Sequence, residues 1–166
     1  MSKQVDMNKK KEQYVQFLQM RKTVVMSMID EQGNPFTSYA PFVQQDGKFY
    51  IYISKISEHY AFLEATKKVS VMFLADEQDA PNLFARERVR FHCTAMNVGN
   101  EGHEEVFTKF EVIHGVPMMG VLRGLDLSLF ELVPSEGRYV VGFGQAFDIN
   151  VSGEKFEHVT GDKKGK

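Results

Sequence analysis

The junction between residues 54 and 59 holds the polar side chains best placed to do chemistry. The hydroxyls of Ser54 and Ser57, the ammonium of Lys55 and the imidazole of His59 come directly before a segment with helical periodicity. Backbone N–H groups in the first turn of a helix lack partners, and the helix dipole favours negative charge there. We therefore expect this junction to bind a phosphate or a carboxylate. The structural alternative is that Ser57 caps the helix and Lys55 is solvated.

A second candidate is the segment 86–95, which alternates charged and apolar residues. As a strand it would carry Arg88, Arg90, His92 and Thr94 on one face, and Val89, Phe91, Cys93 and Ala95 on the other. A basic row beside an apolar row suits a flat anionic ligand. A surface strand with its charges toward water is the alternative.

A third candidate is the glycine pair Gly142 and Gly144, within a predicted strand at 138–147. Two glycines spaced two apart leave one face of a strand without side chains, so that a flat ligand can approach the backbone. Glycines in strands also mark bulges, and the local pattern does not separate the two interpretations.

Other chemistries find no support in the sequence. The five histidines have no metal-site spacing, and there is no phosphate-binding loop, dinucleotide fingerprint or serine-nucleophile motif. Cys93 lies among apolar strand residues and is expected to pack rather than react.

Composition restricts the class of protein further. The chain has 166 residues and a formal net charge of −2, which favours one domain and argues against a nucleic-acid partner. No apolar run is long enough for membrane insertion, the N-terminus lacks the apolar core of a signal peptide, and a single cysteine fits a cytoplasmic location. We expect a disordered N-terminus at 1–8, a barrel domain at 9–152 and a polar C-terminal tail at 153–166.

The predicted elements are mainly β-strands in meander order. Strands are expected at 23–29, 36–43, 48–53, 69–74, 86–98, 127–133 and 138–147, and helices at 9–20, after Ser57, at 101–113 and at 116–125. Residues 134–137 are expected to form a turn between two of the strands. Closure into an antiparallel barrel would remove exposed strand edges.

The strand at 48–53 is apolar on both faces. Phe49 and Ile51 can fill the barrel, whereas Tyr50 and Tyr52 need cover from a helix or from a second subunit. If a second subunit supplies this cover, the protein is a homodimer.

Four ordered motifs resemble those of a known family. Residues 38–43, 53–64, 83–88 and 142–146 are similar to signatures of the pyridoxamine 5′-phosphate oxidase-like split barrels, and specifically of their haem-utilisation (HugZ-type) branch. The resemblance covers roughly residues 10–160. It implies a six-stranded antiparallel split β-barrel with short flanking helices, α+β by count, that dimerises with its ligand sites at the subunit interface.

The resemblance also implies roles for individual residues. In flavin-using relatives the segment matching Ser54–His59 holds the FMN phosphate. In the haem-utilisation branch, residues matching His59 and Arg88 lie near the cofactor, and Asp126 matches an acidic residue linked to hydrogen bonding of the haem ligand. The branch takes its axial histidine from the C-terminal tail, whereas this chain has no histidine after His158. Either His158 ligates the iron, or another group does, or haem is not bound in that way.

Three functions follow as hypotheses. The first is a haem-binding protein of iron or haem utilisation, with haem degradation left open, in which Arg88 pairs with a haem propionate. The second is an FMN-dependent oxidoreductase, with Gln145 near the flavin ring. The third is a barrel that binds a cofactor without catalysis. Pyridoxamine phosphate oxidation itself is not expected, because the tail lacks the Arg-x-His segment of that enzyme.

Overall fold

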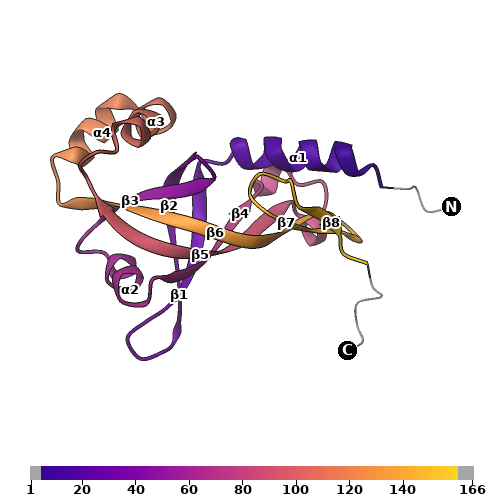
Figure 1. Ribbon diagram of the computed structural model, residues 1–166, viewed down its shortest axis with the longest axis horizontal. Coiled ribbons are helices and arrows are strands. Elements are labelled where there is room, and N and C mark those ends of the chain that lie inside the picture. Colours follow the sequence, from indigo (N-terminus) through magenta and orange to yellow (C-terminus); the bar gives the residue numbers. More distant parts are fainter. Residues whose placement is uncertain (1–4, 161–166) are drawn as a thin grey trace.

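A six-stranded antiparallel barrel with a two-stranded extension forms the centre of the molecule. The computed structural model describes residues 5–160 (Figure 1). The strands are β1 (Thr23–Ile29), β2 (Pro35–Gln45), β3 (Lys48–Ser54), β4 (Lys68–Leu74), β5 (Arg88–Gly99), β6 (Leu127–Gly142), β7 (Gln145–Ile149) and β8 (Phe156–His158). The helices are α1 (Met7–Gln19), α2 (Glu58–Thr66), α3 (Glu104–His114) and α4 (Val116–Arg123), with 3₁₀ turns η1 (Glu77–Asp79) and η2 (Leu83–Ala85).

The sheet order is β3-β2-β1-β4-β5-β6-β7-β8, and β3 also pairs with β6. That pairing closes the first six strands into the barrel, which confirms the predicted fold class. Strands β7 and β8 continue from the distal half of β6, so β6 runs the length of the molecule from α4 to β7 (Figure 1).

The β2–β3 hairpin forms as the sequence predicts. Asp46 and Gly47 both have positive φ, 51° and 73°. Two-residue turns of this kind match the twist of the flanking strands, and Asp-Gly is a preferred pair for them. The turn fixes the register in which Val43 lies opposite Tyr50.

Helices α3 and α4 cover the second apolar face of β3. Phe49 and Ile51 are buried in the barrel, whereas Tyr50 and Tyr52 pack with residues of α3 and α4 in a separate apolar cluster. The rings of Tyr52 and Phe107 meet edge to face, 5.2 Å apart. Helix cover therefore accounts for this face, and it no longer supports a second subunit.

The predicted turn at 134–137 is wrong, because β6 continues through it. Pro134 lies opposite Cys93 and Gly137 opposite Phe91, so β6 carries one extra residue at a bulge. Proline and glycine are tolerated in strands at such irregularities. A Cβ at Gly137 would overlap the Arg90 carbonyl oxygen and come within 2.5 Å of the Phe91 ring. Close approach between strands, rather than a turn, requires this glycine.

Both ends of the barrel domain differ from the prediction. Helix α1 begins at Met7, after Asp6 whose side chain accepts a hydrogen bond from the Lys9 N–H (3.1 Å), so Met7 and Asn8 are helical. At the other end, β8 lies inside the predicted polar tail, and its Phe156 packs against the core. Residues 1–4 and 161–166 of the two predicted end segments lie outside the described residues.

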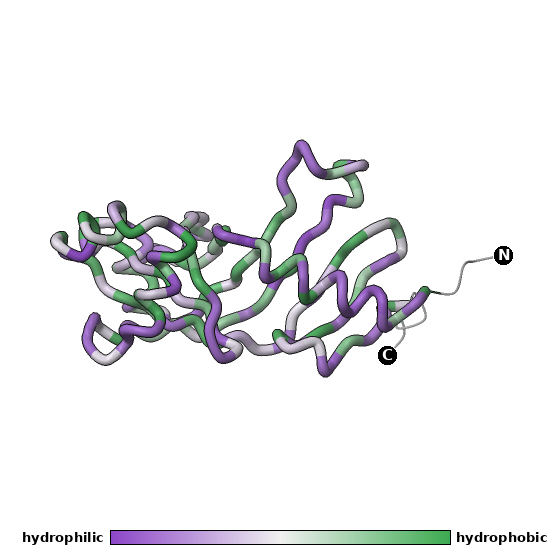
Figure 2. The backbone as a smooth tube through the Cα atoms, turned by 90° about the horizontal axis from the view of Figure 1, so that it is seen from above, coloured by the Kyte–Doolittle hydropathy of each residue, from purple (hydrophilic) through white to green (hydrophobic). Residues whose placement is uncertain are grey.

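Helix α1, near the start of the chain, packs against residues near its end. Its Tyr14 is fully buried, with its ring 5.3 Å from that of Tyr139 and 6.1 Å from that of Phe156, and its hydroxyl donates to the Val151 carbonyl (2.8 Å). The two ends of the described chain accordingly lie on the same side of the molecule in both views (Figures 1 and 2).

Replacing Phe107 with alanine should remove the ring that holds α3 on β3. Phe107 is 1% exposed, and truncation of a buried phenylalanine costs about 3–5 kcal/mol. Urea unfolding measures the loss. Val112→Ala on the same helix, where the side chain is 81% exposed, is the matched control and should change stability by less than about 0.5 kcal/mol. Equal effects of the two variants would contradict the packing described.

The close approach at Gly137 predicts that Gly137→Ala is destabilising by about 1–3 kcal/mol, because backbone and ring must both move. Gly120→Ala in α4, where a Cβ meets nothing within 4 Å, should instead stabilise the protein by about 0.5–1 kcal/mol through helix propensity. Thermal unfolding of both variants tests this, and a neutral Gly137→Ala would show that residues 134–137 do not run as a strand.

Candidate functional site

The strand-to-helix junction forms as the sequence predicts, with Ser54 ending β3 and Ser57 at the N-cap of α2. The Ser57 hydroxyl, however, donates to the Ser54 carbonyl oxygen (2.6 Å) and accepts no hydrogen bond from the helix. The first turn of α2 therefore has no side-chain cap. Its Tyr60 N–H donates to the Ser57 carbonyl (3.2 Å), and the other N–H groups of the turn can face an anion.

The cation of this junction is already paired. Lys55 Nζ lies 2.9 Å from Asp126 Oδ1, and the Lys55 backbone N–H donates to the Asp126 carbonyl oxygen (3.1 Å). The hydrogen bond and the negative charge of Asp126 raise the pKa of Lys55. Lys55, which was expected to bind an anion, and Asp126, which was expected near the haem ligand, thus form one ion pair. An anion that bound here would compete with the Asp126 carboxylate for the Lys55 ammonium group.

His59 faces the barrel rather than this ion pair. Its Nδ1 contacts the Ser38 hydroxyl on β2. The ring is half-buried, and burial lowers the pKa of His59, because desolvation disfavours the charged imidazolium.

A polar network that sequence reasoning missed anchors α2 to the sheet. Asn97 Nδ2 donates to Tyr60 Oη (2.9 Å) and to Glu64 Oε1 (2.5 Å), and Tyr60 Oη lies 3.1 Å from Ser128 Oγ. Ser128 is the one buried polar residue found within residues 5–160. The only sequence signal was this serine in an otherwise apolar run. The network fixes α2 close to the Lys55–Asp126 pair.

The alternation predicted for β5 is confirmed. Val89, Phe91, Cys93 and Ala95 are buried, whereas Arg90, His92 and Thr94 are exposed. Burial raises the pKa of the Cys93 thiol to about 12, as expected for a packing residue.

The arginines of this row keep hydrogen-bonding capacity for a ligand. Arg88 Nη1 donates to the Arg86 carbonyl (2.9 Å), and among the described residues no carboxylate lies within 4.0 Å of Arg88 or Arg90. Arg90 lies opposite Arg138, which is itself paired with Asp148 (2.8 Å). Like charges across a strand pair repel, so an anion at this face would be stabilising.

The two glycines do not share one strand, because Gly142 is the last residue of β6 and Gly144 lies in the turn before β7. Gly144 has a positive φ of 66° in that turn. The space over Gly142 is taken by the protein itself: a Cβ there would lie 3.2 Å from Cδ of Gln145. Nearby, His158 Nε2 donates to the Gly144 carbonyl (2.7 Å), and the His158 ring lies 5.2 Å from the Phe147 ring.

The predicted site residues do not form one site within a single chain. Asp126 immediately precedes β6 and Gln145 follows its far end; at roughly 3.3 Å per residue the 16 residues of β6 span about 50 Å. Arg88, at the Gln145 end, lies opposite Val140 and thus in one row with Ala146. His158 lies opposite Phe147, the next residue, so it is on the other face of the sheet.

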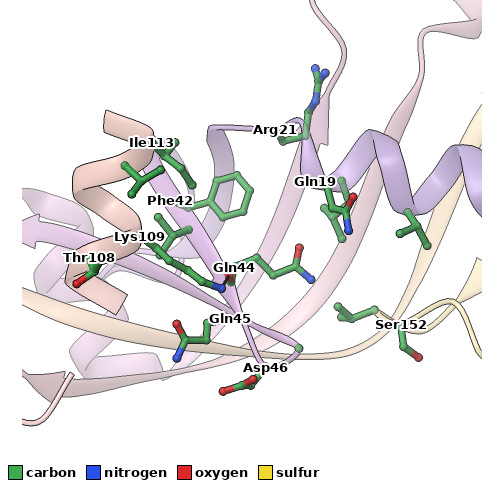
Figure 3. A pocket seen from close by; sticks show the side chains of 16 residues that line it. Gln19, Arg21, Phe42, Gln44, Gln45, Asp46, Thr108, Lys109, Ile113 and Ser152 are labelled. Carbon is green, nitrogen blue, oxygen red and sulfur yellow. Dashed lines mark hydrogen bonds between the residues drawn. The ribbon is translucent and has the colours of Figure 1, made fainter. Parts of the chain in front are cut away.

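A cavity of about 580 Å³ lies elsewhere, between α1, the β2–β3 hairpin and α3 (Figure 3). Its floor includes Leu18 and Phe42, and Lys109 donates to the Gln44 carbonyl at 2.9 Å. None of the predicted site residues lines it, and neither does any histidine or cysteine.

Two general features of the described residues limit the chemistry further. Within 5–160, no three His, Cys, Asp or Glu side chains are grouped so that they could hold a metal ion. In the same part of the chain, no helix is both long enough and apolar enough to cross a membrane.

Comparison with known proteins places these features in context. The family model described as pyridoxamine 5′-phosphate oxidase matches residues 11–140. A curated protein of Vibrio cholerae serotype O1, named haem oxygenase HutZ, is 38% identical over 139 residues, which is 81% of this chain and 78% of that protein.

Solved structures agree with this match. Campylobacter jejuni ChuZ has a TM-score of 0.87 at 28% identity, over 98% of this chain and 68% of that one. Vibrio cholerae HutZ, described there as a haem storage protein, has a TM-score of 0.71 at 33% identity, over 83% and 96% of the two chains. A haem-binding protein of Mycobacterium smegmatis shares the fold, with a TM-score of 0.73 at 16% identity.

The half-buried imidazole of His59 predicts a pH dependence of stability. Because its pKa is lowered in the folded state, the unfolded chain takes up a proton that the folded protein resists as pH falls below about 6.5. Stability should therefore fall between pH 7.5 and 5, and less steeply in His59→Gln. Urea unfolding at several pH values measures this. His92→Gln, at an exposed position, is the control, and parallel curves for wild type and His59→Gln would refute the assignment.

Proposed function

The chain belongs to the pyridoxamine 5′-phosphate oxidase family, in its haem-utilisation branch, and on that premise we propose that it binds haem for iron or haem utilisation. The observation that carries the proposal is the 38% identity, over 81% of the chain, to a protein named a haem oxygenase. A cytoplasmic location stays a proposal based on the single cysteine.

The exposed surface around Arg88 suits such a ligand. Haem is flat and apolar with carboxylates at one edge, so its binding requires both apolar contacts and cations. Arg88 and Arg90 lie without carboxylate partners at the end of the sheet where η2 packs near β6. Phe84 of η2 is 90% exposed and Phe143 in the β6–β7 turn is 69% exposed, so apolar surface is available beside the guanidinium groups.

His158 is the proposed iron ligand. Because a carbonyl oxygen only accepts, the bond to Gly144 places the proton on Nε2 and leaves the lone pair on Nδ1. Imidazole ligands commonly donate their other N–H to a carbonyl or carboxylate. Ligation through Nδ1 would keep the bond to Gly144 intact. Bound haem would supply the iron-centred redox chemistry, and the protein would orient the imidazole and pair with the propionates.

A homodimer would bring the separated groups together. The two ends of β6 are too far apart for one ligand to touch Asp126 and His158 of the same chain. A second copy could place the Lys55–Asp126 end of one subunit beside the Arg88 or His158 end of the other. In this arrangement the residues at the junction before α2 lie near a cofactor that contacts Gln145 of the other subunit. These residues are Ser54, Lys55, Ser57, His59 and Asp126.

One observation favours FMN as the second candidate. The first turn of α2 has no side-chain cap, and such a helix start binds phosphate. An FMN phosphate would have to compete with Asp126 for Lys55. Among haem functions, storage without turnover is the alternative to degradation, since the Vibrio cholerae relative carries both descriptions.

Haem titration tests the proposal. Wild-type protein should develop a Soret band at micromolar haem. His158→Ala should shift that band, because the iron loses its nitrogen ligand, and Arg88→Ala should weaken binding roughly tenfold through loss of a charge-assisted hydrogen bond. Arg88→Lys should not restore full affinity, because an ammonium lacks the forked geometry of guanidinium. Lys109→Ala, a cation removed elsewhere, is the control.

The same protein should be titrated with FMN. If the purified protein is colourless, gives no Soret band with haem and has a higher melting temperature with FMN, the ligand is FMN rather than haem. A monomer in solution would remove the two-subunit arrangement, on which a site that combines Arg88 with His158 depends, because in one chain these two side chains lie on opposite faces of the sheet.

A further inference from the structure

A groove of about 430 Å³ lies on the outer face of the barrel, across β1, β4, β5 and β6. It contains His92 and Thr94, the two members of the predicted basic row that the proposed haem surface does not use. One lysine, one histidine and four hydroxyl side chains line the groove, whereas no aspartate or glutamate does. Hydrogen-bond donors without a carboxylate among them favour an anionic ligand.

The strand register places four of these side chains at the corners of a square on β4 and β5. Lys68 lies opposite Thr94, and Ser70 lies opposite His92. The residues between them on both strands are buried in the barrel, so these four side chains point outward. Diagonal neighbours on such a strand pair lie about 7–8 Å apart, within reach of a long side chain. In this polar square the two basic groups share one diagonal and the two hydroxyls share the other, so all four can reach one anion.

The neighbouring strands add further hydroxyls to the groove. Ser27 of β1 lies opposite Ser70, which extends the row from His92 across three strands. On the other side, the bulge of β6 brings Ser135 to the His92 backbone, where its hydroxyl donates to the carbonyl oxygen (3.0 Å). The bulge that replaces the predicted turn therefore supplies one wall of the groove.

The donors of the groove are not engaged by the protein itself. Within residues 5–160, five of its side chains form neither a hydrogen bond nor an ion pair with another residue, namely Ser27, Lys68, Ser70, His92 and Thr94. An anion that entered the groove would therefore exchange only its own hydration and that of these groups for direct contacts.

The donor set favours phosphate over a carboxylate. Lysine binds phosphate as a point charge, whereas carboxylates pair most specifically with the fork of arginine. The three terminal oxygens of a phosphate group can accept from both cations and hydroxyls. Ile29 and Val133, 44% and 41% exposed, line the same groove and offer apolar surface to an organic group. The volume is within the range of small-molecule pockets, roughly 300–1,000 Å³.

We propose that this groove binds a small phosphomonoester. Its phosphate lies over the polar square, between Lys68 and His92, and its organic group lies against Ile29 and Val133. The site is distinct from the proposed haem surface, because Arg88 lies four residues before His92 on β5, about 13 Å away.

Isothermal titration calorimetry with inorganic phosphate and with phenyl phosphate tests the proposal on protein without haem. Phenyl phosphate should bind more tightly, because its ring covers the apolar side chains, and Val133→Ala should weaken phenyl phosphate alone. Lys68→Gln should weaken both probes about tenfold through loss of a charge-assisted hydrogen bond. Lys67→Gln removes the same charge one residue earlier, outside the groove, and should bind both probes as wild type does.

Thermal unfolding in phosphate-free buffer separates binding from folding, since Lys68 is exposed and Lys68→Gln should unfold at the wild-type temperature. Failure of both probes to bind at millimolar concentration, or equal weakening by Lys68→Gln and Lys67→Gln, would overturn the site. Inorganic phosphate that bound as tightly as phenyl phosphate would overturn the assignment of an ester. Neither probe involves haem, so a failed haem titration would overturn the proposed function without touching this result.

Discussion

The pairing of β6 with three other strands is the constraint on which the rest of the structure depends. Its first half pairs with β3 and closes the barrel, its whole length pairs with β5, and its second half carries β7. No shorter strand could do all three. The same length separates Asp126, directly before β6, from Gln145, which begins β7 after its far end, and Figure 1 shows β6 running from the α4 side to β7. One strand thus both stabilises the fold and divides the candidate binding residues.

Features of the fold that depend on neighbouring residues could be predicted from the sequence. The Asp46–Gly47 turn needs only two backbone conformations, and the alternation along β5 needs only the two-residue period of a strand. The turn predicted at 134–137 failed for the opposite reason. Pro134 and Gly137 carry the same local signal in a turn and in a bulge, and what decides between them is Phe91 on another strand. No local pattern contains that information.

In the candidate site, too, features set by neighbouring residues could be predicted, whereas features set by tertiary contacts could not. The position of Ser57 at the start of α2 and the outward face of Arg90 follow from local periodicity. The ion pair of Lys55 with Asp126, the contact of His59 with Ser38 and the packing of Gln145 on Gly142 depend on tertiary placement. Family resemblance could select these residues as a group, but it could not show which of them already bind one another.

The carboxylate of Asp126 beside Lys55 has a consequence for selectivity. It behaves as a tethered competitor that is always present at high local concentration, so free inorganic anions gain little by approaching this ammonium group. Both side chains of the pair are largely exposed, so the competition is modest, and a ligand that makes further contacts with the protein overcomes it more easily than a small inorganic anion does.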